Sequence, residues 1–360
     1  MIPIASPLIG KEEKEAVLEV LDSGIIAQGP RVEEFEKEFA DFIDAGYAVA
    51  VNSGTEALHM ALLAMGIKEG DEVITTPFTF IATSNSVLYV GAKPVFADID
   101  PETFNISPES VQGKISKRTR AILPVHLYGH PCDMDALDEI AEDHNLLVLE
   151  DACQAHGAEY KGKKVGGLGD AGVFSFYPTK NMTTSEGGML TTDSKEIAEK
   201  AKILRNHGQT ARYQHEFLGF NSRMTDIGAA IGLAQLKKLN EFNNKRIKNA
   251  GYLTKNLKDI EGITTPCVSG DVKHVYHQYT IKVEGNRDTI AGKLQEKGVG
   301  TGVYYPLPTH KQPLYKRLGY ADKLPVAEDM AKKVLSLPVH PQVTKENLDY
   351  MIGVLKGIFD

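Results

Sequence analysis

Asp151 and Lys180 are the two ionisable residues whose surroundings in the sequence point most clearly to chemistry. Asp151 directly follows Leu146–Glu150, a mostly apolar run that predicts a buried strand. Open α/β sheets place ligand-binding groups at such carboxyl ends. A carboxylate there needs a cation or hydrogen-bond donors, because an isolated buried charge is costly. Asp151 could equally cap the segment that follows it.

Lys180 follows Phe174–Tyr177, a largely aromatic stretch. Desolvation by such neighbours would lower the pKa of the lysine amine and make it nucleophilic. A lone lysine is more often a solvated surface residue. The combination of an acid at a strand end with a downstream lysine in a loop containing serine favours a functional site.

Asn52–Leu58 follows a predicted strand and opens a predicted helix. Its small residues allow the backbone to approach an anion, and the free N–H groups of a helix start attract phosphate. An ordinary helix capped by Ser53 or Thr55 would satisfy the same donors, so both interpretations stay open.

Two other patterns are interpreted as structural. Gly167–Gly172 matches G-x-G-x-x-G, but it precedes a predicted strand instead of following one, so we predict a tight turn and no nicotinamide dehydrogenase. His126, His130 and Cys132 are spaced as metal ligands can be, yet no second cluster completes a ligand set, and we expect no metal site.

The elements that must position these residues alternate between short apolar runs and helical patterns. Strands without polar alternation, separated by helices, indicate a mostly parallel sheet covered on both faces. The candidate strands are Ala48–Val51, Glu72–Thr75, Lys93–Asp98, Ala121–Pro124, Leu146–Leu149, Ala171–Ser175 and Gly188–Thr192, and the candidate helices are Lys11–Ser23, Glu33–Phe42, Thr55–Met65 and Asp133–His144.

A long helical pattern from Thr225 to about Leu257 is expected to leave one core and enter another. We therefore predict two domains, with residues 1–240 forming a large domain with an N-terminal arm and residues 241–360 a small α+β domain. In the second we expect strands at His277–Val283 and Val299–Tyr305, and helices at Thr289–Lys297 and Lys345–Ile358.

Composition narrows the class of protein. The 360 residues are 42% hydrophobic and 24% charged, which is typical of a globular chain, and the net charge of −8 argues against a general nucleic-acid or membrane-surface binder. Three cysteines and no secretory segment favour a cytoplasmic protein. The uncharged run Val73–Ala92 contains several polar residues and a proline, so we interpret it as strand, turn and helix.

Seven strings that occur in the same order along the chain carry a resemblance that covers most of it. The strings are SGTEAL (Ser53–Leu58), EDACQAHGA (Glu150–Ala158), FSFYPTKN (Phe174–Asn181), EGG (Glu186–Gly188), GFNSRMTDIGAA (Gly219–Ala230), YYPLPTHKQP (Tyr304–Pro313) and LSLPVHP (Leu335–Pro341). With these strings the chain resembles the DegT/DnrJ-type family of pyridoxal-phosphate-dependent sugar aminotransferases, within the fold-type-I class. That resemblance implies an α/β fold, with a large domain around a mostly parallel central sheet and a smaller C-terminal α+β domain.

The resemblance implies roles for the catalytic and phosphate-binding residues. Lys180 would form the Schiff base with pyridoxal 5′-phosphate and move the substrate proton. Asp151 would keep the pyridine nitrogen protonated, so that the ring acts as an electron sink. Gly54, Thr55 and Ser175 would hold the cofactor phosphate.

The resemblance also assigns residues around the ring. Phe80 matches the position that stacks on it, although a core phenylalanine fits the sequence as well. Gln154 would lie near the ring or its 3′-oxygen. Asn221 would reach the phosphate of the neighbouring subunit, which implies a homodimer with shared active sites. Ser185 stands where family members often have glycine.

The expected substrates are L-glutamate as amino donor and a nucleotide-linked keto-sugar as acceptor. The segment His207–Arg223 resembles the branch that acts on UDP-linked 3-keto N-acetylhexosaminuronates, whereas the wider family prefers 4-keto-6-deoxy sugars. An anionic nucleotide needs a local basic cluster in so acidic a protein. Surface ion pairs explain the same charged residues equally well. The candidate substrate-binding residues are Arg212, Arg223, Tyr304, His310 and Lys311.

Two other functions are compatible with the same fold. A subgroup of similar proteins has histidine at the lysine position and dehydrates the sugar, so Lys180 favours amino transfer. A non-catalytic regulator would have no need of the Asp151–Lys180 pair.

Overall fold

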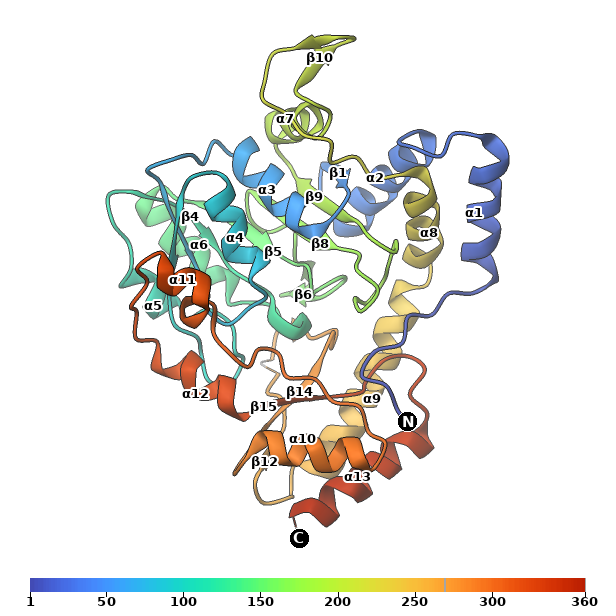
Figure 1. Cartoon of the computed structure of the whole chain (residues 1–360), viewed down its shortest axis with the longest axis vertical. Coiled ribbons are helices and arrows are strands. Elements are labelled where there is room, and N and C mark those ends of the chain that lie inside the picture. Colours follow the sequence, from blue (N-terminus) through green and yellow to red (C-terminus); the bar gives the residue numbers. More distant parts are fainter. Residues whose placement is uncertain (269, 360) are drawn as a thin grey trace.

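The computed structural model describes residues 1–268 and 270–359, and its centre is a seven-stranded sheet (Figure 1). The strand order is β1-β9-β8-β5-β4-β2-β3. The five strands from β8 to β3 run parallel, and β9 is antiparallel to both β8 and β1. The predicted mostly parallel sheet is thus confirmed. The strands are β1 (Tyr47–Val51), β2 (Glu72–Thr75), β3 (Lys93–Phe96), β4 (Thr119–Leu123), β5 (Leu147–Asp151), β8 (Ala171–Ser175) and β9 (Gly188–Thr192).

Helices cover both faces of this sheet, because successive strand residues point to opposite sides. In β1, Val49 and Val51 belong to the core beneath α3 and α7, while Ala48 and Ala50 belong to the core beneath α2 and α8. A third core lies beneath α5 and α6. The helices are α1 (Lys11–Ser23), α2 (Pro30–Ile43), α3 (Gly54–Ala64), α4 (Ala82–Tyr89), α5 (Pro108–Gln112), α6 (Met134–His144), α7 (Lys195–Arg205) and α8 (Asp226–Leu236).

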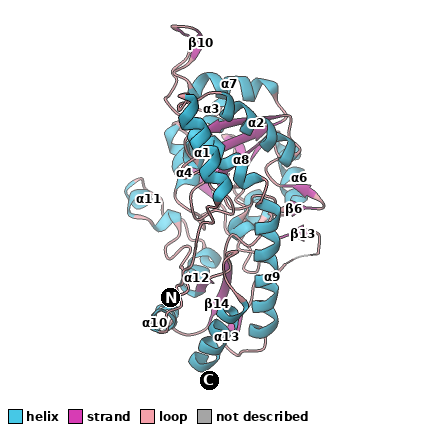
Figure 2. Cartoon of the chain, turned by 90° about the vertical axis from the view of Figure 1, so that its right-hand side faces the viewer, coloured by secondary structure: helices cyan, strands magenta, loops and turns pink. Residues whose placement is uncertain are grey.

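The C-terminal part has its own small sheet, of order β12-β14-β15, and its own core (Figure 2). The segment between α10 and β15 returns to the large sheet, where the ring of Tyr315 packs edge-on against the ring of Phe96. The division at residue 240 stays a prediction. The elements are α9 (Leu239–Leu257), β12 (Ile263–Thr264), β14 (Tyr279–Val283), α10 (Arg287–Glu296), the 3-10 turn η2 (Thr309–Lys311), α11 (Pro313–Arg317), α12 (Pro325–Lys333), β15 (Val334–Leu337) and α13 (Lys345–Phe359).

Several short strands and a 3-10 turn lie between the larger helices and strands. A β10–β11 hairpin projects beyond α7 at one end of the molecule (Figures 1 and 2). In the described part of the chain, no helix has the length and apolar character needed to cross a membrane. The short elements are β6 (Glu159–Tyr160), β7 (Lys163–Lys164), β10 (Gln209–Ala211), β11 (Gln214–His215), β13 (Val272–Lys273) and the 3-10 turn η1 (Leu127–Gly129).

Two sequence predictions are wrong in detail. The helical pattern expected as one helix is divided into α8 and α9, because the Lys238 amide bonds to the carbonyl of Gln235 in a tight turn that ends α8. Val299–Tyr305 is not a strand: Val299 bridges to Ile2 and Gly302 bridges to Ser336, so the run has two different partners and no continuous ladder.

Asp226 at the start of α8 connects the N-terminal arm to the large domain. Its side chain is 1% exposed and accepts hydrogen bonds from the amides of Gly29 (2.8 Å), Val32 (3.0 Å) and Arg31 (3.1 Å). Gly29 has no cap side chain of its own, and a Cβ there would lie 2.8 Å from an Asp226 oxygen. Asp226 therefore caps α2 from a distant part of the sequence.

We expect Asp226→Asn to lower the free energy of unfolding by about 2–4 kcal/mol, because an amide NH2 would face buried N–H donors. Asp193→Asn is the matched control, since Asp193 is exposed and accepts from the single amide of Gly46 at 2.7 Å. Thermal unfolding of both variants measures the difference. Equal losses in the two variants would contradict the capping role.

Candidate active site

The candidate site is a cavity of about 700 Å³ at the carboxyl ends of β5 and β8. These strands run parallel and pair Asp151 with Val173, so both end at the same edge of the sheet. The start of α3, the segment before α4 and two C-terminal segments complete the wall. The lining residues are Ser53, Gly54, Thr55, Leu58, Thr79, Phe80, Ala82, Thr83, Asp151, Cys153, Gln154, Ser175, Tyr177, Thr179, Lys180, Glu186, His277, Gln278, Tyr304 and Tyr305.

Asp151 is the buried acid of this cavity, with 4% of its surface exposed. Its backbone amide bonds to the Pro124 carbonyl at 2.8 Å, which fixes the strand end. One carboxylate oxygen accepts from the Thr83 hydroxyl at 2.8 Å, and the other accepts from the Cys153 amide at 3.1 Å. Asp151 therefore both caps the segment that follows it and lines the cavity, so the two interpretations of this residue are compatible. The carboxylate is held in place by both donors.

Lys180 lies in the same cavity and is half-buried. Burial lowers the pKa of its amine, and the nearby groups of Cys153 and Asp151 oppose that shift only in part. The Lys180 amide bonds to the Tyr177 carbonyl at 2.9 Å, so a tight turn presents the side chain just after the buried Phe176. The backbone of Lys180 is thus fixed by a turn, and its amine is more readily deprotonated than that of a surface lysine.

The start of α3 has donors available for an anion. Ser53 is the N-cap, and its hydroxyl accepts from the Glu56 amide at 3.2 Å. The amides of Gly54 and Thr55 have no hydrogen-bond partner in the described part of the chain. A Cβ at Gly54 would lie 2.6 Å from the Cβ of Ser175, so only glycine lets these two segments meet. The capped-helix and phosphate-binding interpretations are therefore compatible.

The opposite wall contains Gln154 and aromatic residues. Gln154 Oε1 accepts from the Tyr128 amide at 2.9 Å, and its Nε2 donates to the Tyr305 hydroxyl at 3.3 Å. Tyr304 lines the cavity beside Tyr305. Phe80 is 58% exposed, with its ring centroid 6.4 Å from that of Tyr305. This exposure excludes the alternative of a core phenylalanine and leaves the ring open to the cavity.

Asn221 and Arg223 lie outside the lining of the cavity, beside the end of β1. The Asn52 side chain donates weakly to the Asn221 carbonyl at 3.5 Å. Arg223 Nη1 donates to Asn206 Oδ1 at 2.7 Å. Within the single chain the structure does not bring these two residues to Lys180, and their roles stay predictions.

His310 and Lys311 are also outside the cavity lining, where both contact Glu328 of α12. His310 Nε2 is 3.1 Å and Lys311 Nζ is 2.9 Å from the same carboxylate oxygen. Hydrogen bonds from Lys311 and His310 lower the pKa of Glu328 to about 2. Arg212 stacks on the exposed Tyr213 in the projecting hairpin. The substrate roles of these residues stay predictions.

The structure adds site residues that sequence reasoning missed. Thr83, the donor to Asp151, lies in the uncharged run Val73–Ala92, interpreted as strand, turn and helix, and only the fold brings it to β5. His277 and Tyr305 line the cavity from the C-terminal part of the chain. Tyr305 stands in one of the recognised strings, which was the available signal.

Ser185 adopts a left-handed conformation, with φ of 74°. This region favours glycine, the residue that family members often have there. The Ser185 amide bonds to the Thr183 hydroxyl at 3.0 Å, which supports the turn. The serine therefore keeps a turn suited to glycine, next to Glu186 in the cavity wall.

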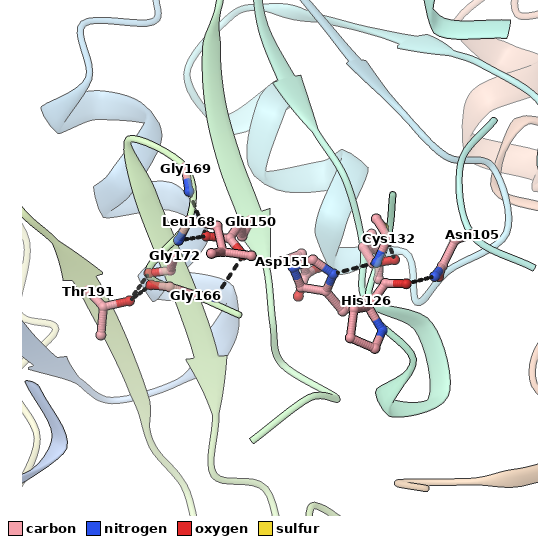
Figure 3. A network of polar contacts seen from close by, with 12 residues as sticks. Asn105, His126, Cys132, Glu150, Asp151, Gly166, Leu168, Gly169, Gly172 and Thr191 are labelled. Carbon is pink, nitrogen blue, oxygen red and sulfur yellow. Dashed lines mark hydrogen bonds and ion pairs between the residues drawn. The ribbon is translucent and has the colours of Figure 1, made fainter. Parts of the chain in front are cut away.

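Glu150 precedes Asp151 and points to the other side of β5 (Figure 3). It is fully buried and accepts from the amides of Gly166 (2.7 Å), Leu168 (2.7 Å) and Gly169 (2.8 Å). The Gly167–Gly172 pattern thus begins with a turn, as predicted, and continues into β8. Two amides of this turn and that of Gly166 surround a carboxylate of the chain itself. This turn leads into β8 and so connects the two strands of the site.

His126 completes the partners of Glu150, with Nε2 at 2.9 Å from the carboxylate. The Cys132 amide donates to His126 Nδ1 at 3.0 Å, so Nε2 carries the proton that Glu150 accepts. Two of the residues considered as metal ligands therefore belong to a hydrogen-bond network around β5 (Figure 3).

We expect Glu150→Gln to lower the free energy of unfolding by about 3 kcal/mol near neutral pH, because it breaks a buried network. Burial raises the pKa of Glu150, but hydrogen bonds from His126 and the turn amides outweigh it, so the pKa lies below its ordinary value of 4.5. The contribution is present above pH 4.5 and is lost as the pH falls through the folded-state pKa.

Thermal unfolding near neutral pH and below pH 4.5 checks this expectation. Glu139→Gln, an exposed position on α6, is the control and should have little effect. A penalty for Glu150→Gln that does not shrink on acidification would contradict the assignment.

Comparison with known proteins identifies the family. The sequence matches the DegT/DnrJ/EryC1/StrS aminotransferase family over residues 7–356. The chain belongs to this family. The S. venezuelae DesV crystal structure, in complex with a ketimine intermediate, superposes with a TM-score of 0.95 at 39% identity and covers 99% of each chain. The fold-type-I class implied by the strings is confirmed.

Relatives of this family member carry different substrate names. A GDP-perosamine synthase from Caulobacter vibrioides is 44% identical over 366 residues, covering 99% of this chain and 98% of the relative. A UDP-N-acetyl-3-dehydro-alpha-D-glucosamine 3-aminotransferase from Acidithiobacillus ferrooxidans is 39% identical over 338 residues, covering 94% and 91%. The chain is a sugar aminotransferase of amino-sugar biosynthesis, in a family of pyridoxal-phosphate-dependent enzymes.

Proposed function

We propose that this enzyme uses pyridoxal 5′-phosphate to move an amino group from L-glutamate to the keto group of a nucleotide-linked sugar. The observation that carries the proposal is the presence of Asp151 and Lys180 in one cavity at the ends of adjacent parallel strands. The site combines a buried acid fixed by two donors with a lysine whose pKa is lowered. Both features are expected of a site for this cofactor, whereas a pocket that only binds a ligand needs neither.

The residues present fit the cofactor. The free amides of Gly54 and Thr55, with the hydroxyls of Thr55 and Ser175, would hold its phosphate at the start of α3. Phe80 has the exposed ring that a stacked aromatic group would cover. Gln154 would lie near the ring, since it is tied to Tyr128 and Tyr305 in the cavity wall.

The cofactor, when bound, supplies an electron sink for breaking the Cα–H bond of the donor. Asp151 would hold a proton on the ring nitrogen by charge pairing, and Thr83 keeps its carboxylate in place. Lys180 Nζ would accept the proton that leaves the donor Cα and return it later. The Asp151 carboxylate acts from a fixed position, so it needs little reorganisation.

The acceptor is proposed to be a UDP-linked 3-keto N-acetylhexosaminuronate or a 4-keto-6-deoxy sugar. A relative named for 3-amination of a UDP-N-acetyl sugar, 39% identical, supports a 3-keto acceptor. A GDP-perosamine synthase, 44% identical, is the more similar of these two relatives. Tyr304 is the one candidate substrate residue that lines the cavity. We propose that Asn221 and Arg223 serve the site of a second copy in a homodimer. His310 and Lys311 would act only if their contacts with Glu328 open.

Dehydration is the alternative reaction on this fold. Similar proteins that dehydrate sugars have histidine at the position of Lys180, so the lysine favours amino transfer. Production of an amine from a keto-sugar that depends on L-glutamate would distinguish the two reactions.

We expect enzyme reconstituted with pyridoxal phosphate to absorb near the edge of the visible range, and Lys180→Ala to lose this band. The half-reaction with L-glutamate should slow by at least about 10³-fold in the variant, because the proton acceptor is gone. Lys163→Ala, an exposed lysine on β7, should behave as wild type. Absorption spectra and stopped-flow mixing measure both effects. A wild-type enzyme without the band would contradict the proposal.

A further inference from the structure

His277 is a side chain of the cavity with no assigned task. It is 6% exposed, lines the cavity together with Lys180, and comes from the segment before β14. In the described part of the chain no group hydrogen-bonds to its ring, and Nδ1 is fully buried without a partner. Buried polar atoms without partners are rare in folded proteins and call for an explanation such as a missing ligand.

Arg246 of α9 contacts the backbone of His277. Its Nη1 donates to the carbonyls of Tyr276 (3.2 Å) and His277 (3.4 Å), and its Nε is buried without a partner. The side chain is 5% exposed, and burial lowers the pKa of the guanidinium to about 10, so it stays charged at neutral pH. In the described residues Arg246 has only these carbonyl partners and no carboxylate, which is costly for a buried cation.

The groups that shift the pKa of His277 are basic, and the acids Asp151 and Glu186 line the same cavity. Lys180, Arg246 and His156 all act with burial to hold the pKa of His277 well below its ordinary value. His340 also lies near Arg246, which lowers its pKa together with burial. Arg246 is thus a buried cation beside neutral imidazoles. A carboxylate placed beside His277 would be stabilised by the charge of Arg246 and would accept a hydrogen bond from the His277 ring.

We propose that His277 forms a carboxylate-binding subsite in the cavity, facing a carboxylate that is part of a substrate. This inference rests on the proposed function. The amino donor and a uronate sugar are the two substrate carboxylates that the enzyme would meet. The free amides at the start of α3 would form a separate anion site. They belong to a helix that follows β1 of the large sheet, whereas His277 lies in the segment before β14. The cavity would thus have one subsite for a phosphate and another for a carboxylate.

The first test uses glutarate, which has two carboxylates but no amine to react. Its affinity is measured by calorimetry on enzyme loaded with pyridoxal phosphate. We expect His277→Leu to bind glutarate roughly 10- to 100-fold more weakly, because a hydrogen bond to a charged group is lost. His277→Gln keeps an N–H donor and should recover part of the loss. Glutaramide, the uncharged analogue, should bind weakly to all forms.

His340→Leu is the matched control, because His340 is a buried histidine near Arg246 that does not line the cavity. It should bind glutarate as wild type does. Unchanged glutarate affinity in His277→Leu would overturn the proposal. So would an equal loss in His340→Leu, which would indicate a general structural effect.

The second test separates the two sources of the carboxylate. If the donor supplies it, His277→Leu needs a higher L-glutamate concentration for the half-maximal rate of the donor half-reaction, with a smaller change in the limiting rate. If the acceptor supplies it, the variant loses the preference of the pyridoxamine-phosphate-loaded enzyme for UDP-glucuronate over UDP-glucose. If His277→Leu shows neither of these two changes, the proposal is overturned.

These results are distinguishable from failure of the proposed function. Wild-type enzyme that L-glutamate does not convert would refute the donor assignment, whereas glutarate and UDP-glucuronate binding would still report on the subsite. Lys180→Ala should abolish conversion without the selective loss of glutarate affinity expected for His277→Leu.

Discussion

The site depends on how a carboxylate can be buried at the end of a parallel strand. Asp151 is charged only if donors compensate for the water that it has lost. The Thr83 hydroxyl and the Cys153 amide provide that compensation, one at each oxygen. Helix α4, which contains Thr83, and the turn after β5 must therefore keep fixed positions. The same arrangement leaves the carboxylate at the wall of the cavity, within the electrostatic reach of Lys180.

Strand β5 performs two tasks on its two sides. Asp151 faces the cavity, while Glu150 holds the turn that leads into β8 and accepts a hydrogen bond from His126. Strand β8 ends at Ser175, close to Gly54 at the start of α3. The Glu150 network therefore also determines where the proposed phosphate-binding residues meet the sheet. Structural and chemical roles are thus combined in two adjacent residues. The alternation of side chains along a strand makes this possible.

Much of the large domain was predictable from the sequence, because buried strands are short apolar runs and their carboxyl ends mark the site. Asp151, Lys180 and Gly54 were found in this way, with the family strings. Thr83 and His277 were not, since an ordinary threonine and a histidine acquire their tasks only through contacts across the fold. The prediction of a strand at Val299–Tyr305 was wrong, because the local sequence pattern does not reveal that this run bridges to two different segments.

The central claim is that Asp151 controls the protonation of the cofactor ring. The most direct measurement is the ¹⁵N NMR shift of the ring nitrogen in enzyme loaded with ¹⁵N-labelled pyridoxal phosphate. Our account predicts a protonated nitrogen in the wild type and an unprotonated one in Asp151→Asn, because the carboxylate is the acidic partner of the cavity. The same shift in both proteins would contradict it.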